Sequence, residues 1–395
     1  MNNEKIYLDN ASTTNLGAEV LNAMLPVLTS NYGNSASTHS FGRNAASLVE
    51  ESRNLIAESV NAKADEIYFT SSGSEANSWA IVGIAEANRD KGNHIITTTI
   101  EHPSVLEACK FLENNGYEVT YLNVDKNGFL NFVELLRAIK PTTILMSVVA
   151  ANNELGTIQN IKAISQTAHE KGVIFHTDAT QLFGNMDIDV DDLGIDAMSI
   201  SAHRIHGPKG IGALYVSNKI KIDPIIFGGA QEHGKRGGII NTAAIVGFAK
   251  ATEIAHRDMK TNNHKLRNLS EYFVSKLTES VEHITLNANV RQKLSNIISV
   301  TFVGVDGESL ATKLDLNGVA AATVGDGSSN LSYVLKAVGL SNDNAKCTLR
   351  FSLGKNNSYE EIDKAISIIT RSVEELREFS STYGMKTRKR KGDNQ

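Results

Sequence analysis

Short apolar runs alternate with segments of helical periodicity between residues 66 and 235 of this chain. Each apolar run has the length of a buried strand, and apolar residues recur at helical spacing in most of the intervals. The strand candidates are 67–70, 94–98, 118–122, 143–149, 173–176, 196–200 and 212–216, and the helix candidates are 75–90, 103–115, 131–139 and 160–171. This alternation predicts an α/β fold with a mostly parallel sheet covered on both faces.

Further elements lie on either side of this region, and those that follow it predict a second, smaller domain. Helical patterns cover about 17–29 and 39–60, and a long helix is expected over about 242–277. Short strands at 297–303 and 347–352 then alternate with helices at 308–315 and 359–378, which is typical of an α+β domain. We therefore predict a large domain over 15–255, a small domain from 1–14 and 256–380, and a disordered tail over 381–395.

Composition narrows the class of protein. Of the 395 residues 41% are hydrophobic and 21% are charged, and the net charge of -5 argues against a general affinity for nucleic acid. Basic residues gather only in the tail, where a solvated segment is the expectation and a nucleic-acid or partner contact the alternative. Two cysteines, no signal-peptide pattern and no membrane-length apolar run predict a protein of the cytoplasm that has no disulfide framework, zinc site or membrane partner.

Polar motifs follow the ends of the predicted strands. In a parallel sheet the carboxyl ends of the strands form the usual ligand site. The motifs are Ser71 to Glu75, Glu101-His102, Asn152 to Glu154, Asp178 to Gln181, and Ser201 to Arg204. We expect them to meet at one edge of the sheet.

Each motif alone has a structural as well as a chemical interpretation. Residues 70–77 could cradle a phosphate at a helix start, or simply cap that helix. Asp178 could hold a positive ring nitrogen or cap the next helix, and His102 could stack on a ring or open a helix. Arg350, a single cation in an apolar run, is expected to be paired or to bind a carboxylate.

Taken together and in this order, the motifs resemble the NifS/IscS-type cysteine desulfurases, class V aminotransferases of pyridoxal phosphate (PLP) fold type I. The resemblance runs from Tyr7-Leu8-Asp9-Asn10-Ala11-Ser12-Thr13-Thr14 to Leu349-Arg350-Phe351-Ser352-Leu353-Gly354. Between these lie Gly33 to Ser37, Thr99 to His102, Asn152 to Gly156, Asp178 to Gln181, and Gly207 to Val216. It implies a large seven-stranded sheet domain, a smaller domain and a homodimer with active sites at the interface.

The resemblance also implies roles for individual residues. For PLP it implies Asp178 at the pyridine nitrogen, His102 stacked on the ring, Asn153 and Gln181 at the ring substituents, and Gly73, Ser74, Ser201 and His203 at the phosphate. For an amino-acid substrate it implies Asn34 and Arg350 at the carboxylate.

The sequence departs from the family pattern at three places. Arg204 stands where the family has the lysine that forms a Schiff base with PLP, and a guanidinium cannot make that bond. The loop 322–331 contains no cysteine, although the family places its catalytic thiol there. Ile239 replaces a threonine that reaches the partner's cofactor phosphate. Of the two cysteines, Cys109 is expected in the core, and Cys347 is only a weak candidate for a substitute sulfur carrier.

Three hypotheses follow for the function. The first is a cysteine desulfurase-like protein of sulfur or iron–sulfur metabolism that cannot perform standard desulfuration and acts as a partner or regulator. It would form a homodimer, or a heterodimer with an active paralogue, and contact a sulfur acceptor or iron–sulfur scaffold. The second is an enzyme of altered chemistry with non-covalently bound PLP, in which Arg204 contacts cofactor or substrate. The third is an amino-acid or anion-binding module without PLP.

Overall fold

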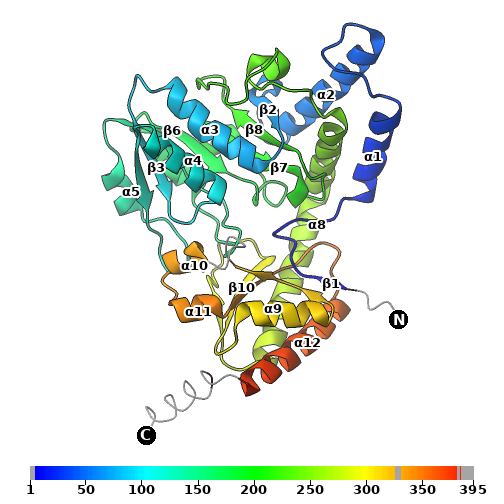
Figure 1. The fold of residues 1–395 in the computed structure, drawn as a ribbon, viewed down its shortest axis with the longest axis vertical. Helices are drawn as coiled ribbons and strands as arrows, with labels where there is room; N and C mark the ends of the chain where they lie inside the picture. The colour runs from blue at the N-terminus through cyan, green and yellow to red at the C-terminus, as the bar shows by residue number, and fades with distance from the viewer. Residues whose placement is uncertain (1–4, 325–330, 380–382, 384–395) are drawn as a thin grey trace.

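A computed structural model describes residues 5–324, 331–379 and 383 of the chain. The long helix α8 (Thr242–Ser280) runs through both of the lobes seen in Figure 1. The larger lobe lies around its first half, and the smaller lobe around its second half. The predicted domain boundary at 255/256 falls inside this continuous helix, so the boundary itself stays a prediction.

The larger lobe is built on a seven-stranded sheet of order β2-β8-β7-β6-β5-β3-β4. Six strands run parallel, and β8 is antiparallel to both of its neighbours. The strands are β2 (Ile67–Thr70), β3 (His94–Thr98), β4 (Glu118–Leu122), β5 (Thr143–Ser147), β6 (Ile174–Asp178), β7 (Ala197–Ser201) and β8 (Gly212–Val216). The predicted strands and the mostly parallel topology are confirmed.

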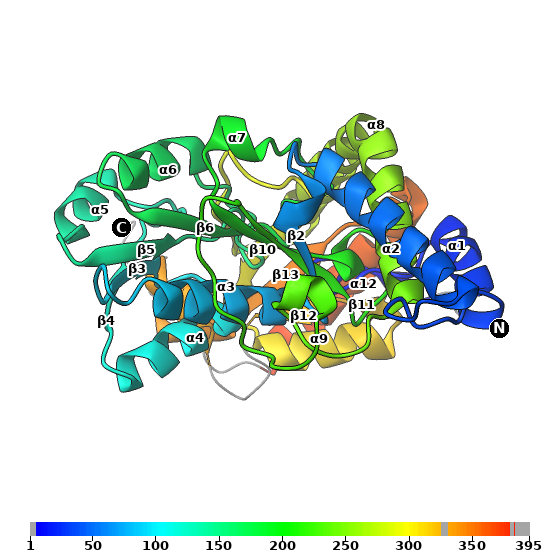
Figure 2. The ribbon, with the colours of Figure 1, turned by 90° about the horizontal axis from the view of Figure 1, so that it is seen from above.

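Helices cover both faces of this sheet. In Figure 2, α3 (Gly73–Ala87) and α4 (Pro103–Asn114) lie on one side, and α6 (Ile161–His169) and α7 (Val190–Leu193) on the other. The remaining helices of this lobe are α1 (Ala18–Thr29), α2 (Ser40–Glu58) and α5 (Phe132–Ala138), with short 3₁₀ turns η1 (Ala64–Glu66), η2 (Ala202–Arg204) and η3 (Gln231–Gly234). Fully buried Trp79 and Phe175 belong to separate apolar clusters, as expected for a sheet with two covered faces.

The smaller lobe contains a four-stranded antiparallel sheet of order β12-β13-β10-β9. Its strands are β9 (Ile284–Asn287), β10 (Ile297–Phe302), β12 (Ala322–Thr323) and β13 (Thr348–Ser352). Its helices are α9 (Gly307–Leu316), α10 (Tyr333–Ala337), α11 (Asn342–Lys346) and α12 (Tyr359–Glu378). Phe273, Phe302 and Phe351 form the centre of its own apolar core.

The amino-terminal segment joins the smaller lobe before it reaches the larger one. Strand β1 (Ile6–Tyr7) pairs in parallel with β11 (Val319–Ala320), and Ile6 and Leu8 are buried in the small core. The assignment of residues 1–14 to the small domain stays a prediction, since Ala11 packs in the core of the larger lobe. The predicted tail lies outside the described residues apart from Tyr383. No helix in the described ranges combines the length and apolarity needed to cross a bilayer.

Candidate ligand-binding site

The turn after β7 is held in place by the amino-terminal segment. Ser201 ends the strand, and the 3₁₀ turn η2 carries His203 and Arg204. The backbone N–H and the hydroxyl of Thr14 both donate to the carbonyl of His203, at 3.0 and 2.8 Å. The Thr14 hydroxyl in turn accepts the N–H of His206, whose φ of 62° is left-handed. Residues 189 positions apart therefore fix the orientation of this turn.

Arg204 has a shielded guanidinium. Within the described part of the chain, its Nε and Nη1 are buried and have no hydrogen-bond partner. Burial, followed by the charge of Arg350, lowers the pKa of this guanidinium, while Asp178 and Asp9 oppose the shift. The resulting pKa is about 10. The group stays protonated at neutral pH, so Arg204 is a cation without a bonded counterion.

Asp178 lies at the carboxyl end of β6 and is 3% exposed. Its Oδ1 accepts the backbone N–H and the hydroxyl of Thr180, at 2.9 and 2.7 Å. Its Oδ2 accepts from the side-chain amide of Asn77 in α3 at 2.7 Å. The local capping role considered for Asp178 is confirmed, and the pairing with a ring nitrogen stays a prediction.

A chain of hydrogen bonds extends from Asp178 to His102. Asn77 also donates to the Ser104 hydroxyl at 3.0 Å, and that hydroxyl lies 2.8 Å from Nδ1 of His102. His102 is the N-cap of α4 and accepts the backbone N–H of Ser104. Burial lowers the pKa of His102, so its ring is neutral at pH 7. The helix-start role of His102 is confirmed, and stacking on a ring remains untested.

The start of α3 lies against the same region. Ser72 caps the helix by accepting the N–H of Glu75, as expected for a serine in this position. A Cβ on Gly73 would stand 2.6 Å from Cγ2 of Thr180, so only glycine permits this close approach of helix and loop. Ser201 is buried, whereas Ser74 is exposed at the helix start. Phosphate binding by these residues is neither supported nor contradicted by their contacts.

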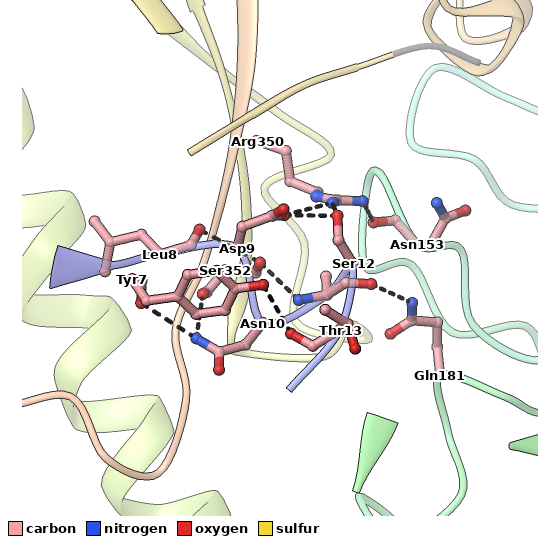
Figure 3. Close-up of polar contacts among 11 residues, drawn as sticks. Tyr7, Leu8, Asp9, Asn10, Ser12, Thr13, Asn153, Gln181, Arg350 and Ser352 are labelled. Carbon is pink, nitrogen blue, oxygen red and sulfur yellow. Dashed lines mark hydrogen bonds and ion pairs between the residues drawn. The ribbon is translucent and has the colours of Figure 1, made fainter. Parts of the chain in front are cut away.

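Arg350 joins the two lobes (Figure 3). From β13, its Nη2 donates to Asp9 Oδ1 at 2.8 Å and to the Ser12 hydroxyl, and its Nη1 donates to the carbonyl of Asn153 at 2.9 Å. Ser12 also donates to Asp9 at 2.7 Å. Arg350 is 5% exposed, and its Nε has no partner among the described residues. The expectation that this lone cation is paired is confirmed, with Asp9 as its counterion.

Segment 7–14 contacts several of the residues for which the resemblance implies ligand roles. Gln181 donates its amide to the carbonyl of Ala11 at 3.0 Å, and Nδ1 of His203 lies 3.1 Å from the Thr13 hydroxyl. Burial lowers the pKa of His203 to about 4, and the charge of Arg204 acts in the same direction. The sequence interpretation named this segment only as a landmark and gave no role to Asp9 or Ser12. A polar loop directly after a two-residue apolar run is the signal that could have indicated it.

Other predicted residues lie apart from this network. Asn34 is exposed, and its side-chain oxygen accepts the N–H of Ala36, with no described contact to Arg350. Ile239 is 76% exposed. Cys109 is buried, as expected for a core residue. Cys347 precedes β13 and acts electrostatically on Arg377 in α12, whereas Arg350 reaches Asn153 in the larger lobe. Cys347 and Arg350 therefore have different surroundings, although they are close in sequence.

A cavity of about 1070 Å³ lies elsewhere in the molecule, between the two lobes. It is lined by residues of α6, α8 and the β9–β10 region, among them Lys162, Asn263, Lys293 and Ser299. None of the residues predicted to bind ligand lines this cavity. The loop 322–331 cannot be placed against either site, because residues 325–330 lie outside the described ranges.

Comparison with known proteins assigns this arrangement to a family. The model of the aminotransferase class-V family matches residues 6–365. Cysteine desulfurase IscS of Clostridium botulinum is 44% identical over 386 residues, which cover 96% of this chain and 97% of the relative. The chain belongs to the class-V aminotransferase family, in its cysteine desulfurase branch.

Solved structures agree with this placement. A NifS-like protein matches with a TM-score of 0.90 and 34% identity, covering 94% of this desulfurase homologue and 100% of the other chain. SspA in complex with cysteine matches with a TM-score of 0.80 and 35% identity, covering 89% and 100%. The predicted PLP fold type I is thereby confirmed.

The family depends on PLP, and the residues of this desulfurase homologue fit that group only in part. Asp178, His102, Gly73, Ser201, His203 and Gln181 supply the carboxylate, ring, backbone and hydroxyl groups that suit non-covalent binding. The guanidinium of Arg204, whose Nε and Nη1 are buried without a hydrogen-bond partner among the described residues, is a group that cannot form a Schiff base. Non-covalent binding of PLP therefore stays a prediction.

Proposed function

We propose that this protein is a cysteine desulfurase homologue of sulfur metabolism that does not perform standard desulfuration and acts as a partner or regulator. The observation that carries the proposal is Arg204. Its guanidinium lies shielded beside Asp178 and Arg350, where the family reaction needs an amine that can lose its proton. The absence of cysteine from the sequence of loop 322–331 supports the same conclusion.

PLP, when bound, supplies an electron sink for carbanion chemistry at an amino-acid substrate. Toward that group, Asp178 would hold a ring nitrogen, His102 would cover the ring, and Ser201 and His203 would donate to the phosphate. Asn77 and Thr180 orient Asp178, and Ser104 orients His102. Arg204 adds a fixed positive charge but no proton transfer, because its pKa lies far above neutrality.

An enzyme of altered chemistry is the second candidate. It is favoured by Arg350, a buried cation that could receive a substrate carboxylate, and by the oriented carboxylate of Asp178. A relative of 35% identity has been solved in complex with cysteine. In this candidate PLP binds non-covalently and another group moves protons.

Association with a second protein chain is part of the proposal. Leu21, Leu25 and Leu28 lie along one exposed face of α1, at 43, 46 and 57% exposure. Tyr32 and Phe41 are 71 and 52% exposed, and their rings lie 5.8 Å apart. Exposed large apolar side chains that lie close together are typical of an interface. We expect a homodimer, or a heterodimer with an active paralogue, and contact with a sulfur acceptor or iron–sulfur scaffold.

Two measurements on the purified full chain test the proposal. Sulfide and alanine formation from cysteine should be absent with added PLP and reductant, while an active desulfurase assayed in parallel produces both. Robust alanine formation would overturn it. Light scattering should show a dimer, and Leu25→Glu should shift it toward the monomer. A spectrum taken with and without added PLP separates the second candidate from the first, because only the second requires bound cofactor.

A further inference from the structure

We infer that Arg204 is a receptor for the carboxylate of a small organic acid, bound by ion pairing and hydrogen bonds. This deepens the proposed function, because it rests on a site in which residue 204 makes no covalent bond. It assigns a ligand class to a residue that the desulfurase reaction cannot use.

The first support is the set of unpartnered donors. Nε and Nη1 of Arg204 and Nε of Arg350 are buried, and none of the three has a hydrogen-bond partner in the described ranges. An N–H that is buried without a partner destabilises the folded state, and more so when it carries charge. The residue as a whole is of intermediate exposure, so part of its side chain reaches the surface.

The second support is the state of the neighbouring groups. Both oxygens of Asp178 already accept from Asn77 and Thr180, and Asp9 already accepts from Arg350 and Ser12. These carboxylates act on Arg204 through space without bonding to it. Among the described residues, the buried Nε and Nη1 of Arg204 therefore have no acceptor in contact, although Asp178 and Asp9 favour the charge through space.

The third support concerns the remaining cationic side chains. Burial lowers the pKa of both His102 and His203, so neither ring is charged at pH 7. Arg204 and Arg350 are then the cations of this region whose mutual repulsion a ligand could relieve. A guanidinium presents a planar fork of donors that a carboxylate can accept with both of its oxygens, which a neutral amide cannot do.

This assignment predicts an unusual stability effect. A buried charge without a bonded partner destabilises the ligand-free protein, so removing it should not weaken the fold. Arg204→Met removes the charge and keeps an unbranched side chain that covers the aliphatic part of arginine. The melting temperature of the ligand-free variant should equal or exceed that of the wild type, whereas a structural arginine would give a lower value.

The experiment is a thermal-shift titration of the full chain with l-alanine and pyruvate at constant ionic strength. Ethylamine, which lacks the carboxylate, and inorganic phosphate are the comparison probes. At ten times Kd the two carboxylates should raise the melting temperature by roughly 2 °C, and ethylamine should not. Arg204→Met should abolish the shift, and Arg204→Lys should retain part of the l-alanine shift. The exposed Arg137→Met is the matched control and should respond like the wild type.

Three outcomes would overturn the inference. In the first, phosphate raises the melting temperature and the carboxylates do not. In the second, the carboxylates raise the melting temperature of Arg204→Met as much as that of the wild type. The third is loss of folding or a markedly lower melting temperature in ligand-free Arg204→Met, together with no carboxylate shift in Arg204→Lys. The proposed function is judged separately by sulfide and alanine formation, so either can fail while the other stands.

Discussion

The guanidinium of Arg350 donates to the carboxylate of Asp9 at 2.8 Å, across 341 positions of sequence. Arg350 belongs to the sheet of the smaller lobe, and Asp9 belongs to the segment that crosses toward the larger one. The same arginine holds the carbonyl of Asn153 in the larger lobe. One side chain therefore ties three separate parts of the chain at the candidate site (Figure 3).

Asp9→Asn should destabilise the protein by about 2–3 kcal/mol, because it leaves the buried Arg350 without its counterion. The Asp9 side chain is 22% exposed, which places the expected loss below that of a fully buried pair. Urea denaturation measures the change. Asp315→Asn is the control, since it breaks the exposed ion pair with Lys5, and it should leave stability unchanged. Equal effects of the two substitutions would contradict the interpretation.

A second buried ion pair fixes the segment that includes Arg236 and Ile239. Nη1 and Nη2 of Arg53 donate to the two carboxylate oxygens of Glu232 at 2.8 Å, and Glu232 also accepts the N–H of Phe69 at 2.7 Å. Glu232 itself has a left-handed φ of 46°. Glu232→Ala should cost about 3–5 kcal/mol, since Arg53 loses its buried counterion and keeps only the ion pair with the exposed Glu50.

A double variant tests whether this loss of stability comes from the charge of Arg53, which Glu232→Ala leaves without its buried counterion. Arg53→Met combined with Glu232→Ala should be more stable than Glu232→Ala alone, as judged by the same urea denaturation. A double variant as unstable as the sum of the two single variants would show that packing, and not the unpaired charge, accounts for the loss.

Much of the fold could be predicted because its signals are local. The strands 67–70, 94–98, 118–122 and 212–216 are short runs that contain β-branched, aromatic or other apolar residues, and the structure has the same bounds. Strands β1, β11 and β12 were not predicted, because two residues carry no periodicity. The helix α7 was not predicted either, because its four residues are too few to show a helical period.

The site could be predicted in position but not in its contacts. Polar residues at the ends of β6 and β7 indicated the edge of the sheet, since that edge is a property of parallel topology. The partners of Arg350 and Gln181 could not be found this way, because Asp9 and Ala11 lie 341 and 170 positions away. Only the folded chain shows that segment 7–14 closes onto these side chains.

The stability of the protein should depend on pH through Glu101. Burial raises the pKa of this carboxyl to about 8, although Thr98 and the N–H of Val149 donate to its Oε1. Since the folded pKa exceeds the unfolded one, the folded state holds the proton more tightly between about pH 4.5 and 8. The contribution of Glu101 is therefore full below this window and is lost as the pH rises through it, at up to about 1.4 kcal/mol per pH unit.

Glu101→Gln isolates this contribution, because the amide keeps the acceptor oxygen and cannot ionise. The difference in unfolding free energy between variant and wild type should be small near pH 5 and should grow in favour of the variant by pH 8. Urea denaturation at intervals of half a pH unit measures it. A difference that stays constant across the window would show that the pKa of Glu101 is the same in the folded and unfolded states.

Arg204→Lys should separate cofactor attachment from sulfur transfer. A lysine at the end of β7 would have the nucleophilic amine that arginine lacks, while Asp178, His102 and His203 would remain to hold PLP. With added PLP, the variant should gain an absorbance band and a borohydride-stable adduct that peptide mass spectrometry maps to residue 204. The wild type should give neither. Sulfide release from cysteine should stay absent in both proteins, because loop 322–331 still contains no thiol to accept the sulfur. An adduct at another lysine, or sulfide release by the variant, would show that the chain uses a different anchor or a different sulfur carrier.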